Sequence, residues 1–277
     1  MTKLTLVLSV VLSLVTAPAL ARPLRVVSLN LCSDQLLMAL ADRDQIASLS
    51  FFAADPRFSL ITDQIEGLPL NHGLAEEVLA LRPDLVITGN YTARYAVQHI
   101  KALNIPIVEL APAQDFVQIA ARLLTVGQAI GHTGRAQALV TRMQARLEEI
   151  DRINVQQPLR VLSFASGGAT IGSPSLFNAV VTRAGHSNLP ATELGMGSWG
   201  QIGLEGIIQL QPDFVLLEGL QQEHNSLTRN LMQHRAIRKL LATDKMRLAP
   251  VDGRLWSCGG PHTVEAVAAF KSLGANQ

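Results

Sequence analysis

The apolar and polar residues of the chain fall into blocks that predict short buried strands followed by amphipathic helices. Residues 24–29 are almost continuously apolar and predict a strand. Apolar side chains at helical spacing then predict a helix over residues 33–40, for which Ser33 or Asp34 can cap the first turn. Residues 24–40 are therefore predicted to form a strand followed by a helix.

The same alternation continues through the next 70 residues. A helix predicted over residues 75–81 ends at Arg82-Pro83, because a residue that precedes proline avoids the helical region. Strands are predicted at residues 85–88 and 105–110, with a helix between them at residues 94–103. This order is typical of a parallel sheet with helices on its faces.

One unit of this pattern occurs twice. Residues 76–87 correspond to residues 205–216 at a constant spacing of 129 positions, and both copies contain Pro-Asp before an apolar run. Residues 25–29 are similarly echoed by residues 160–164. A Pro-Asp pair after a helix is a common stop signal, but a match over the whole unit favours two lobes of similar architecture.

Between the two copies, residues 133–153 form one long amphipathic pattern, with Thr133 as a possible cap. A helix that joins two lobes is stiffer than a Gly/Ser linker, so we expect only modest lobe closure. The predicted fold class is α/β, with two similar lobes whose parallel-rich sheets are joined by a single long backbone helix.

The amino terminus has the layout of a cleavable export signal: Lys3, an apolar run over residues 4–15, and the small-residue pattern Ala19-Leu20-Ala21. The run is short for a membrane span, and a retained anchor is the less favoured alternative. We therefore expect a periplasmic protein without a membrane helix. The predicted organisation is a signal peptide at 1–21, an N-terminal lobe at 22–131, a linking helix at 132–156 and a C-terminal lobe at 157–277.

Composition narrows the range of partners. Charged residues make up 16% of the chain and the formal net charge is +1, which argues against a nucleic-acid partner or an anionic membrane surface. We expect a monomer. The only two cysteines, Cys32 and Cys258, can pair in an oxidising compartment, but the sequence does not decide between one disulfide and two free thiols.

Enzyme and metal chemistry find little support. Residues 195–200 satisfy the pattern GxGxxG but follow no buried strand, and Ser198 lacks the glycine that a nucleophile elbow needs two residues earlier. The seven histidines are scattered without paired spacing. We predict no catalytic residue, no cofactor and no metal site, and keep a periplasmic cofactor-handling enzyme as a distant alternative.

The chain resembles the periplasmic substrate-binding proteins of ABC importers for iron-siderophore complexes, haem and vitamin B12. The resemblance covers the mature chain and rests on residues 25–30, on residues 76–87 and on the second copy around Pro212-Asp213. It implies two α/β lobes on one backbone helix, a bulky ligand between them, and an ABC permease dimer with its ATPase as partner.

The resemblance also implies a docking role for one glutamate on each lobe. The matching positions are Glu76 and Glu205, whose carboxylates would pair with permease arginines. Each glutamate alone is equally well explained by the preference of acidic residues for the first turn of a helix. Their equivalence under the repeat favours docking.

Ligand contacts are expected between the lobes, at the carboxyl ends of the parallel strands. Trp199 lies six residues before Glu205. The vitamin B12-binding member of the family has a tryptophan at the corresponding position, where it packs on the ligand. Six residues before Glu76, where a second tryptophan would be expected, this chain has Leu70. We predict a corrinoid slightly ahead of a ferric siderophore, with haem third. The predicted ligand-binding residues are Asn30, Cys32, Phe51, Phe52, Tyr91, Trp199 and Trp256.

Overall fold

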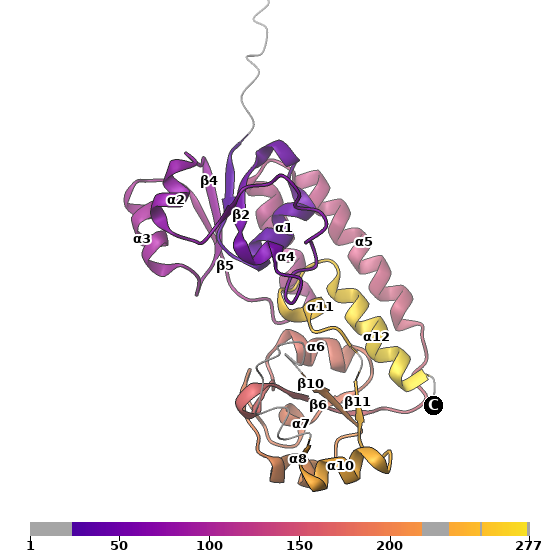
Figure 1. The fold of residues 1–277 in the computed structure, drawn as a ribbon. Coiled ribbons are helices and arrows are strands. Elements are labelled where there is room, and N and C mark those ends of the chain that lie inside the picture. Colours follow the sequence, from indigo (N-terminus) through magenta and orange to yellow (C-terminus); the bar gives the residue numbers. More distant parts are fainter. Residues whose placement is uncertain (1–23, 218–232, 250, 276–277) are drawn as a thin grey trace, which may run out of the picture.

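The structure is a computed structural model that describes residues 24–217, 233–249 and 251–275. The predicted export signal, residues 1–21, lies outside the described residues. The described chain forms two α/β lobes, with a long helix, α5 (Thr133–Asp151), along one side of the molecule (Figure 1). The predicted fold class is therefore confirmed.

The N-terminal lobe contains a five-stranded sheet in the order β3-β2-β1-β4-β5, and every pairing in it is parallel. Parallel neighbours need a crossover between them, which the helices of this lobe supply. The strands are β1 (Val26–Ser28), β2 (Ile46–Ser50), β3 (Leu70–Asn71), β4 (Leu85–Gly89) and β5 (Ile107–Leu110). The helices are α1 (Leu31–Leu40), α2 (Ala75–Ala80), α3 (Arg94–Ala102) and α4 (Phe116–Ala129), with short 3₁₀ helices η1 (Arg43–Gln45) and η2 (Phe51–Ala54).

Helix α1 begins two residues earlier than predicted. Its cap is Asn30, whose side-chain oxygen accepts a hydrogen bond from the backbone N–H of Ser33 at 2.8 Å. The Asn30 amide nitrogen donates to Thr92 Oγ1 at 3.1 Å, which ties the start of α1 to the loop after β4. Asn30 thus uses its side chain to hold the fold together.

The C-terminal lobe contains a four-stranded parallel sheet in the order β11-β10-β6-β8 and a two-stranded antiparallel pair, β7 with β9. The strands are β6 (Arg160–Phe164), β7 (Ala169–Thr170), β8 (Ser187–Asn188), β9 (Gly200–Gln201), β10 (Phe214–Leu217) and β11 (Arg247–Leu248). The described helices are α6 (Leu176–Arg183), α7 (Leu189–Thr192), α8 (Leu204–Leu210), α10 (Arg235–Ala242), α11 (Arg254–Ser257) and α12 (Thr263–Ala275), with the short 3₁₀ helix η3 (Ser166–Gly168).

The duplicated sequence unit builds the centre of both sheets in the same register. Val26 of β1 pairs with Leu85 of β4, and the corresponding Val161 of β6 pairs with Phe214 of β10. The residues before these strands are also alike, since Arg82 and its counterpart Gln211 both have positive φ, at 49° and 46°. The two lobes therefore share one structural unit, as the repeat predicts.

Helix α5 runs along the side of both lobes and packs on α4 of the N-terminal lobe and on α12 (Figure 1). Its buried side chains, among them Val140 and Leu147, belong to a hydrophobic core that also includes Leu36 of α1 and Phe270 of α12. Arg146 of α5 forms a two-point ion pair with Glu265 of α12, at 2.9 and 3.0 Å. This packing joins the lobes through a continuous apolar core.

Among the described residues, no helix is long and apolar enough to cross a membrane. The lobe boundaries predicted at residues 131/132 and 156/157 flank α5 and stay predictions.

Candidate functional site

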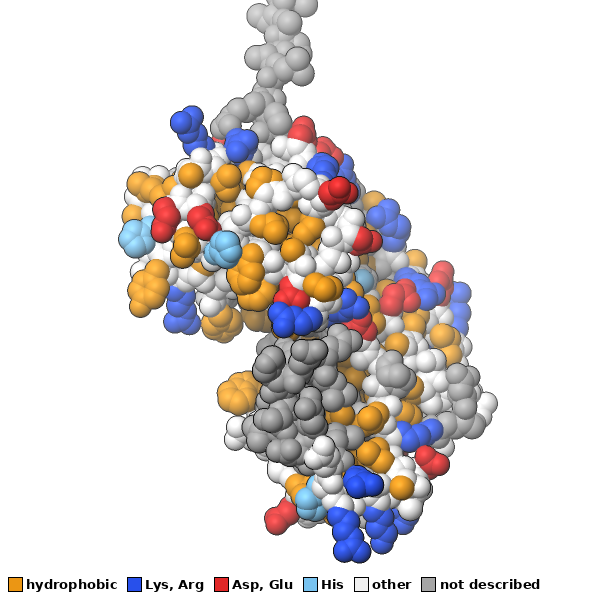
Figure 2. Space-filling model, viewed as in Figure 1, with side chains coloured by type: hydrophobic (Ala, Val, Ile, Leu, Met, Phe, Trp, Pro, Cys, Tyr) orange, Lys and Arg blue, Asp and Glu red, His pale blue; other side chains and the backbone are white. Residues whose placement is uncertain are grey.

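A cavity of about 1490 Å³ lies between the lobes, and both lobes line it. It is larger than the roughly 300–1,000 Å³ of ordinary small-molecule pockets. The space-filling view shows the molecule narrowing between the upper and lower lobes (Figure 2). Some of the lining residues lie at or just after the carboxyl ends of β4, β5, β6, β10 and β11, which is where parallel sheets place their binding sites.

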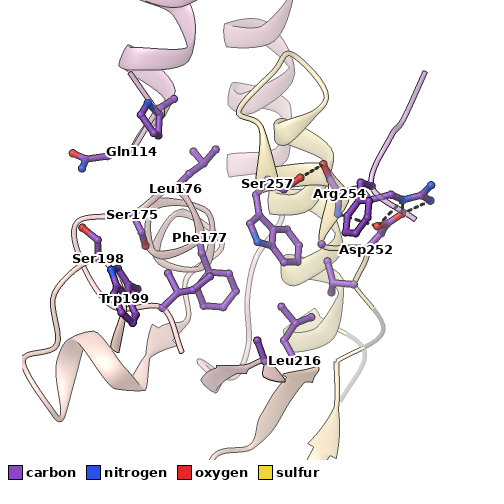
Figure 3. A pocket seen from close by; sticks show the side chains of 18 of the residues that line it. Gln114, Ser175, Leu176, Phe177, Ser198, Trp199, Leu216, Asp252, Arg254 and Ser257 are labelled. Atoms are coloured by element: carbon purple, nitrogen blue, oxygen red, sulfur yellow. Dashed lines mark hydrogen bonds and ion pairs between the residues drawn. The ribbon is translucent and has the colours of Figure 1, made fainter. Parts of the chain in front are cut away.

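The N-terminal lobe lines the cavity with Tyr91 and with residues 111–114. Tyr91 follows β4, is 73% exposed, and lines the cavity. Residues 111–114 follow β5 and line the cavity, and Gln114 lies above Ser175 and Leu176 in the close view (Figure 3). The Tyr91 side chain has no hydrogen bond to any described residue.

The C-terminal lobe contributes the opposite wall. Ser198 and Trp199 lie on the loop before β9, and Ser175 and Leu176 lie at the start of α6 (Figure 3). The Trp199 side chain is 73% exposed. A large aromatic ring exposed at a cavity wall offers a flat surface for stacking, with no cost of breaking a packed core.

The floor of the cavity is aromatic and buried. Trp256 of α11 is only 5% exposed, and its ring centroid lies 5.7 Å from that of Phe177 and 5.9 Å from that of Phe270. Phe177 and Trp256 both line the cavity. Because these rings support one another, the floor is a fixed apolar surface.

Two arginines line the cavity, and each is paired with an aspartate two residues before it. Arg57 Nη2 lies 2.5 Å from Asp55 Oδ2, and Arg254 Nη2 lies 2.6 Å from Asp252 Oδ2. In both pairs the arginine Nε and its own backbone N–H also donate to the aspartate. We name these two motifs the Asp-x-Arg clips.

The clips neutralise most of the charge at the cavity wall. Hydrogen bonds from the Arg57 side chain and backbone lower the pKa of Asp55 to about 2, so this carboxyl is ionised at neutral pH. The side-chain hydrogen bond from Arg254 likewise lowers the pKa of Asp252 and raises that of Arg254. The cavity therefore presents paired charges and aromatic rings, with no cluster of unpaired cations among the described lining residues.

Three of the predicted ligand residues, Tyr91, Trp199 and Trp256, are brought together by the cavity. Phe51 and Phe52 lie outside it: their rings are 4.0 Å apart, and Phe51 stacks on His72 at 5.2 Å. Asn30 is used as the cap of α1.

Cys32 is bonded to Cys258, with a Cα–Cα distance of 4.8 Å. The question that the sequence left open is thus answered in favour of a disulfide, and Cys32 has no free thiol to offer a ligand.

Several lining residues were not predicted from the sequence. They include Phe58, Leu176, Phe177 and Leu216, all of them apolar. A helix or strand core uses the same residue types, so no signal separates them. The repeated Asp-x-Arg motif at Asp55 and Asp252 is the one pattern that would have indicated two related sites.

The two candidate docking carboxylates occupy equivalent places. Glu76 lies in the first turn of α2 and Glu205 in the first turn of α8, and both side chains are exposed. Neither has an ion pair or hydrogen bond with another described residue. Both positions also suit a carboxylate near the positive end of a helix.

No group of three or more His, Cys, Asp or Glu side chains is arranged to hold a metal ion in the part of the chain that the structure describes. Two α/β lobes around a large aromatic cavity define a two-lobed ligand-binding protein. The model of the periplasmic binding protein family matches residues 26–254. The chain belongs to this family, as the sequence resemblance predicts.

Relatives and solved structures agree with this assignment. The chain is 27% identical over 201 residues to a cobalamin-binding protein of Halobacterium salinarum, covering 71% of this chain but only 54% of that protein. It is 23% identical to an uncharacterized ABC transporter substrate-binding lipoprotein of Bacillus subtilis, covering 88% of this chain and 78% of that one. The fold matches that of the periplasmic heme-binding protein RhuT from Roseiflexus sp. RS-1 with a TM-score of 0.75 at 21% identity, over 92% of this chain and all of that one.

Proposed function

We propose that this protein is the exported substrate-binding component of an ABC importer, and that it captures a corrinoid of the vitamin B12 class between its two lobes. The observation that carries the proposal is the aromatic cavity of about 1490 Å³, which both lobes line. A ligand that fills it must be bulky. The exposed Trp199 ring offers it a flat surface for stacking, and the buried Trp256 is part of the apolar floor.

Electrostatics supports a ligand of low net charge. The two lining arginines are held in the Asp-x-Arg clips, so their charges are already balanced by Asp55 and Asp252. A strongly anionic ferric catecholate would need additional unpaired cations. A corrinoid, with its apolar ring edge and amide side chains, suits aromatic rings together with the amides and hydroxyls of Gln114, Ser175 and Ser198.

A ferric complex is the second candidate, because Tyr91 presents a phenol to the cavity. Phenolate oxygen is a ligand of ferric iron, including haem iron. The Tyr91 side chain is 73% exposed and its hydroxyl has no partner among the described residues. The ferric complex would be a ferric siderophore or haem, because both expose iron or an iron-bound group to the protein.

Delivery completes the proposed function. Glu76 and Glu205 would present the loaded protein to the permease dimer, whose ATPase drives uptake, and the protein would act as a monomer without turnover of its ligand. The segment 1–21 would direct export and be removed. The ABC transporter substrate-binding lipoprotein among the relatives supports this assignment of partners.

Calorimetric titration of the purified protein tests the ligand. Cyanocobalamin, a panel of ferric siderophores and haemin are titrated separately. We expect saturable one-to-one binding of cyanocobalamin and recovery of the ligand unmodified. Heat with a ferric siderophore or haemin alone would replace the corrinoid by the second candidate, and turnover of any ligand would contradict a binding role.

A further inference from the structure

Helix α11 belongs by sequence to the C-terminal lobe, yet it lies where the two lobes meet (Figure 1). The segment that contains it, residues 252–258, runs from the second Asp-x-Arg clip to Cys258. We call this segment the α11 junction. It lines the cavity through Asp252, Gly253, Arg254, Trp256 and Ser257.

Three links attach the α11 junction to the N-terminal lobe. The disulfide joins Cys258 to Cys32 of α1. The buried Arg122 of α4 donates from Nη1 to the Cys258 carbonyl at 2.9 Å. Arg254 Nη1 donates to the carbonyl oxygens of Pro56 and Ser59, at 2.9 and 3.2 Å.

The Arg254 link joins the two Asp-x-Arg clips to each other. Asp252 fixes the Arg254 guanidinium from one side with a two-oxygen pair, which leaves Nη1 directed at the N-terminal lobe. Its acceptor Pro56 is the middle residue of the other clip. Arg57, in contrast, makes no hydrogen bond to the C-terminal lobe among the described residues.

The chain approaches the N-terminal lobe closely at this point. Gly259, directly after Cys258, has a positive φ of 63°, and a Cβ there would meet Ala113 Cβ and Leu176 Cδ2 at 3.0 Å. These two neighbours come from opposite lobes. A side chain at residue 259 would therefore press on both.

On its other side the α11 junction is fixed to the C-terminal lobe by Trp256, which packs on Phe177 of α6 and Phe270 of α12. Helix α5 and the α11 junction thus both join the lobes, and Trp256 belongs to the same apolar core as the buried face of α5. The α11 junction is the connection that contains the cavity-lining tryptophan.

We propose that the α11 junction is a second, covalent connection between the lobes that positions Trp256 in the cavity, so that full ligand affinity requires the Cys32–Cys258 disulfide. Arg254 and Cys258 are positioning residues, because they act on the ligand through Trp256. The inference rests on the proposed function of the cavity. The dithiol form, as it exists before an oxidising compartment is reached, then binds its ligand weakly.

Formation of the junction is a thiol–disulfide exchange. The two thiols lose two protons and two electrons to the disulfide of an exchange partner, which leaves as a dithiol. The cavity floor would be completed by this step, so ligand capture and oxidation of the chain are coupled.

The first experiment needs no ligand. A Trp199→Phe variant leaves Trp256 as the single tryptophan, and acrylamide quenching of its fluorescence is measured in the oxidised and the reduced protein. We expect reduction to raise the quenching constant at least about twofold, because local opening exposes the ring. Arg254→Lys in the same background should raise it as well, since a lysine cannot both fork onto Asp252 and reach Pro56.

The matched control is Arg57→Lys, which breaks the same clip on the N-terminal lobe without cutting a link between lobes. Its Trp256 quenching should equal that of the parent. Equal quenching in the oxidised and reduced protein, with two free thiols titrated in the latter, would overturn the proposal.

The second experiment measures affinity for cyanocobalamin at 10 °C before and after reduction, with far-UV circular dichroism to establish that the fold is kept. We expect the Kd to rise about tenfold on reduction and to return on reoxidation with oxidised glutathione. A Cys32→Ser/Cys258→Ser variant should bind with the higher Kd of the reduced protein. Neither the reductant nor oxidised glutathione should change that Kd.

An unchanged Kd in the reduced protein would contradict the proposal that full ligand affinity requires the disulfide. If the oxidised protein binds cyanocobalamin, ferric siderophores and haemin equally poorly, the proposed function fails instead, and the quenching experiment still decides whether the α11 junction exists.

Discussion

Asp34 holds Ser50 at two points: its Oδ1 accepts the backbone N–H of Ser50 at 2.9 Å, and its Oδ2 accepts the hydroxyl at 2.5 Å. Ser50 is the last residue of β2 and precedes η2, which leads to the cavity wall at Arg57. Asp34 is fully buried, and burial raises its pKa to about 7 despite the lowering effect of hydrogen bonds from Ser28 and Ser50.

This raised pKa predicts that the contribution of Asp34 to stability falls as the pH rises from about 4 to about 7. In that window the folded protein keeps a proton on Asp34 that the unfolded chain releases, so the folded state binds more protons and loses stability with rising pH. At about 1.4 kcal/mol per pKa unit, a shift of about three units corresponds to roughly 4 kcal/mol.

Urea unfolding at pH 5 and pH 8 measures the effect. Burial lowers the pKa of His262 to about 4, which makes stability rise with pH in the same range, so the Asp34 contribution is measured as the difference between two proteins. We expect Asp34→Asn to gain stability relative to the wild type on going from pH 5 to pH 8. The exposed Asp63, replaced by Asn, serves as the control and should show no such gain. The same pH dependence in Asp34→Asn and in the wild type would assign it to another group.

Trp199 is predicted to contribute affinity without contributing stability. Because its side chain is 73% exposed, Trp199→Ala should change the free energy of unfolding by less than about 0.5 kcal/mol. If the indole stacks on the ligand, the same variant should weaken cyanocobalamin binding by about 1–3 kcal/mol. Calorimetry of the variant beside Tyr95→Ala, an aromatic that is 83% exposed and lies outside the cavity lining, distinguishes stacking from a general surface effect.

Much of the fold could be predicted from the sequence because its centre is repeated. The strands β1, β4 and β6 and the helices α2, α3 and α5 lie where their apolar patterns place them, within a few residues. Strand β2 was not predicted: it has the sequence IASLS, whose three small residues give no strand pattern, yet all five are buried by neighbouring β1 and β3. Its burial is decided by tertiary packing, which a local pattern does not contain.

The site was only partly predictable for a related reason. Tyr91, Trp199 and Trp256 were found because aromatic residues are rare in this chain and these three follow predicted strands or lie in loops. Trp256 nevertheless packs into an apolar floor with Phe177, which no loop signal marked. The disulfide depends on a Cα–Cα distance of 4.8 Å between residues 226 positions apart, which only the folded chain establishes.

The repeated unit contains a stabilising contact that predicts a loss on substitution. Asp213 Oδ2 accepts the backbone N–H of Arg160 at 2.7 Å, just as Asp84 Oδ2 accepts that of Arg25 at 2.8 Å. Asp213→Ala leaves the Arg160 N–H without this acceptor at the start of a central strand. We therefore expect the free energy of unfolding to fall by about 1–3 kcal/mol. Chemical unfolding beside the surface variant Asp63→Ala checks the value, and a loss no larger than that of Asp63→Ala would show that the contact contributes little.

The last prediction separates docking from ligand capture. Glu76 and Glu205 are exposed at equivalent positions of the repeat and are unpaired among the described residues, so replacing both by alanine removes charge without leaving a buried group unsatisfied. Helix stability should fall by less than about 1 kcal/mol, because each carboxylate interacts only with the first turn of its own helix.

Ligand affinity of the double variant should equal that of the wild type, since neither glutamate lines the cavity, while uptake by cells that depend on this protein should be lost. A matched variant, Glu66→Ala/Glu193→Ala, removes one exposed glutamate from each lobe away from α2 and α8 and should take up ligand normally. Reduced affinity in the first variant would place the glutamates at the ligand site, and normal uptake would leave them with no role beyond the first turn of a helix. Loss of uptake in both variants would attribute the effect to net charge, because the two variants differ in where the charge is removed and not in its amount.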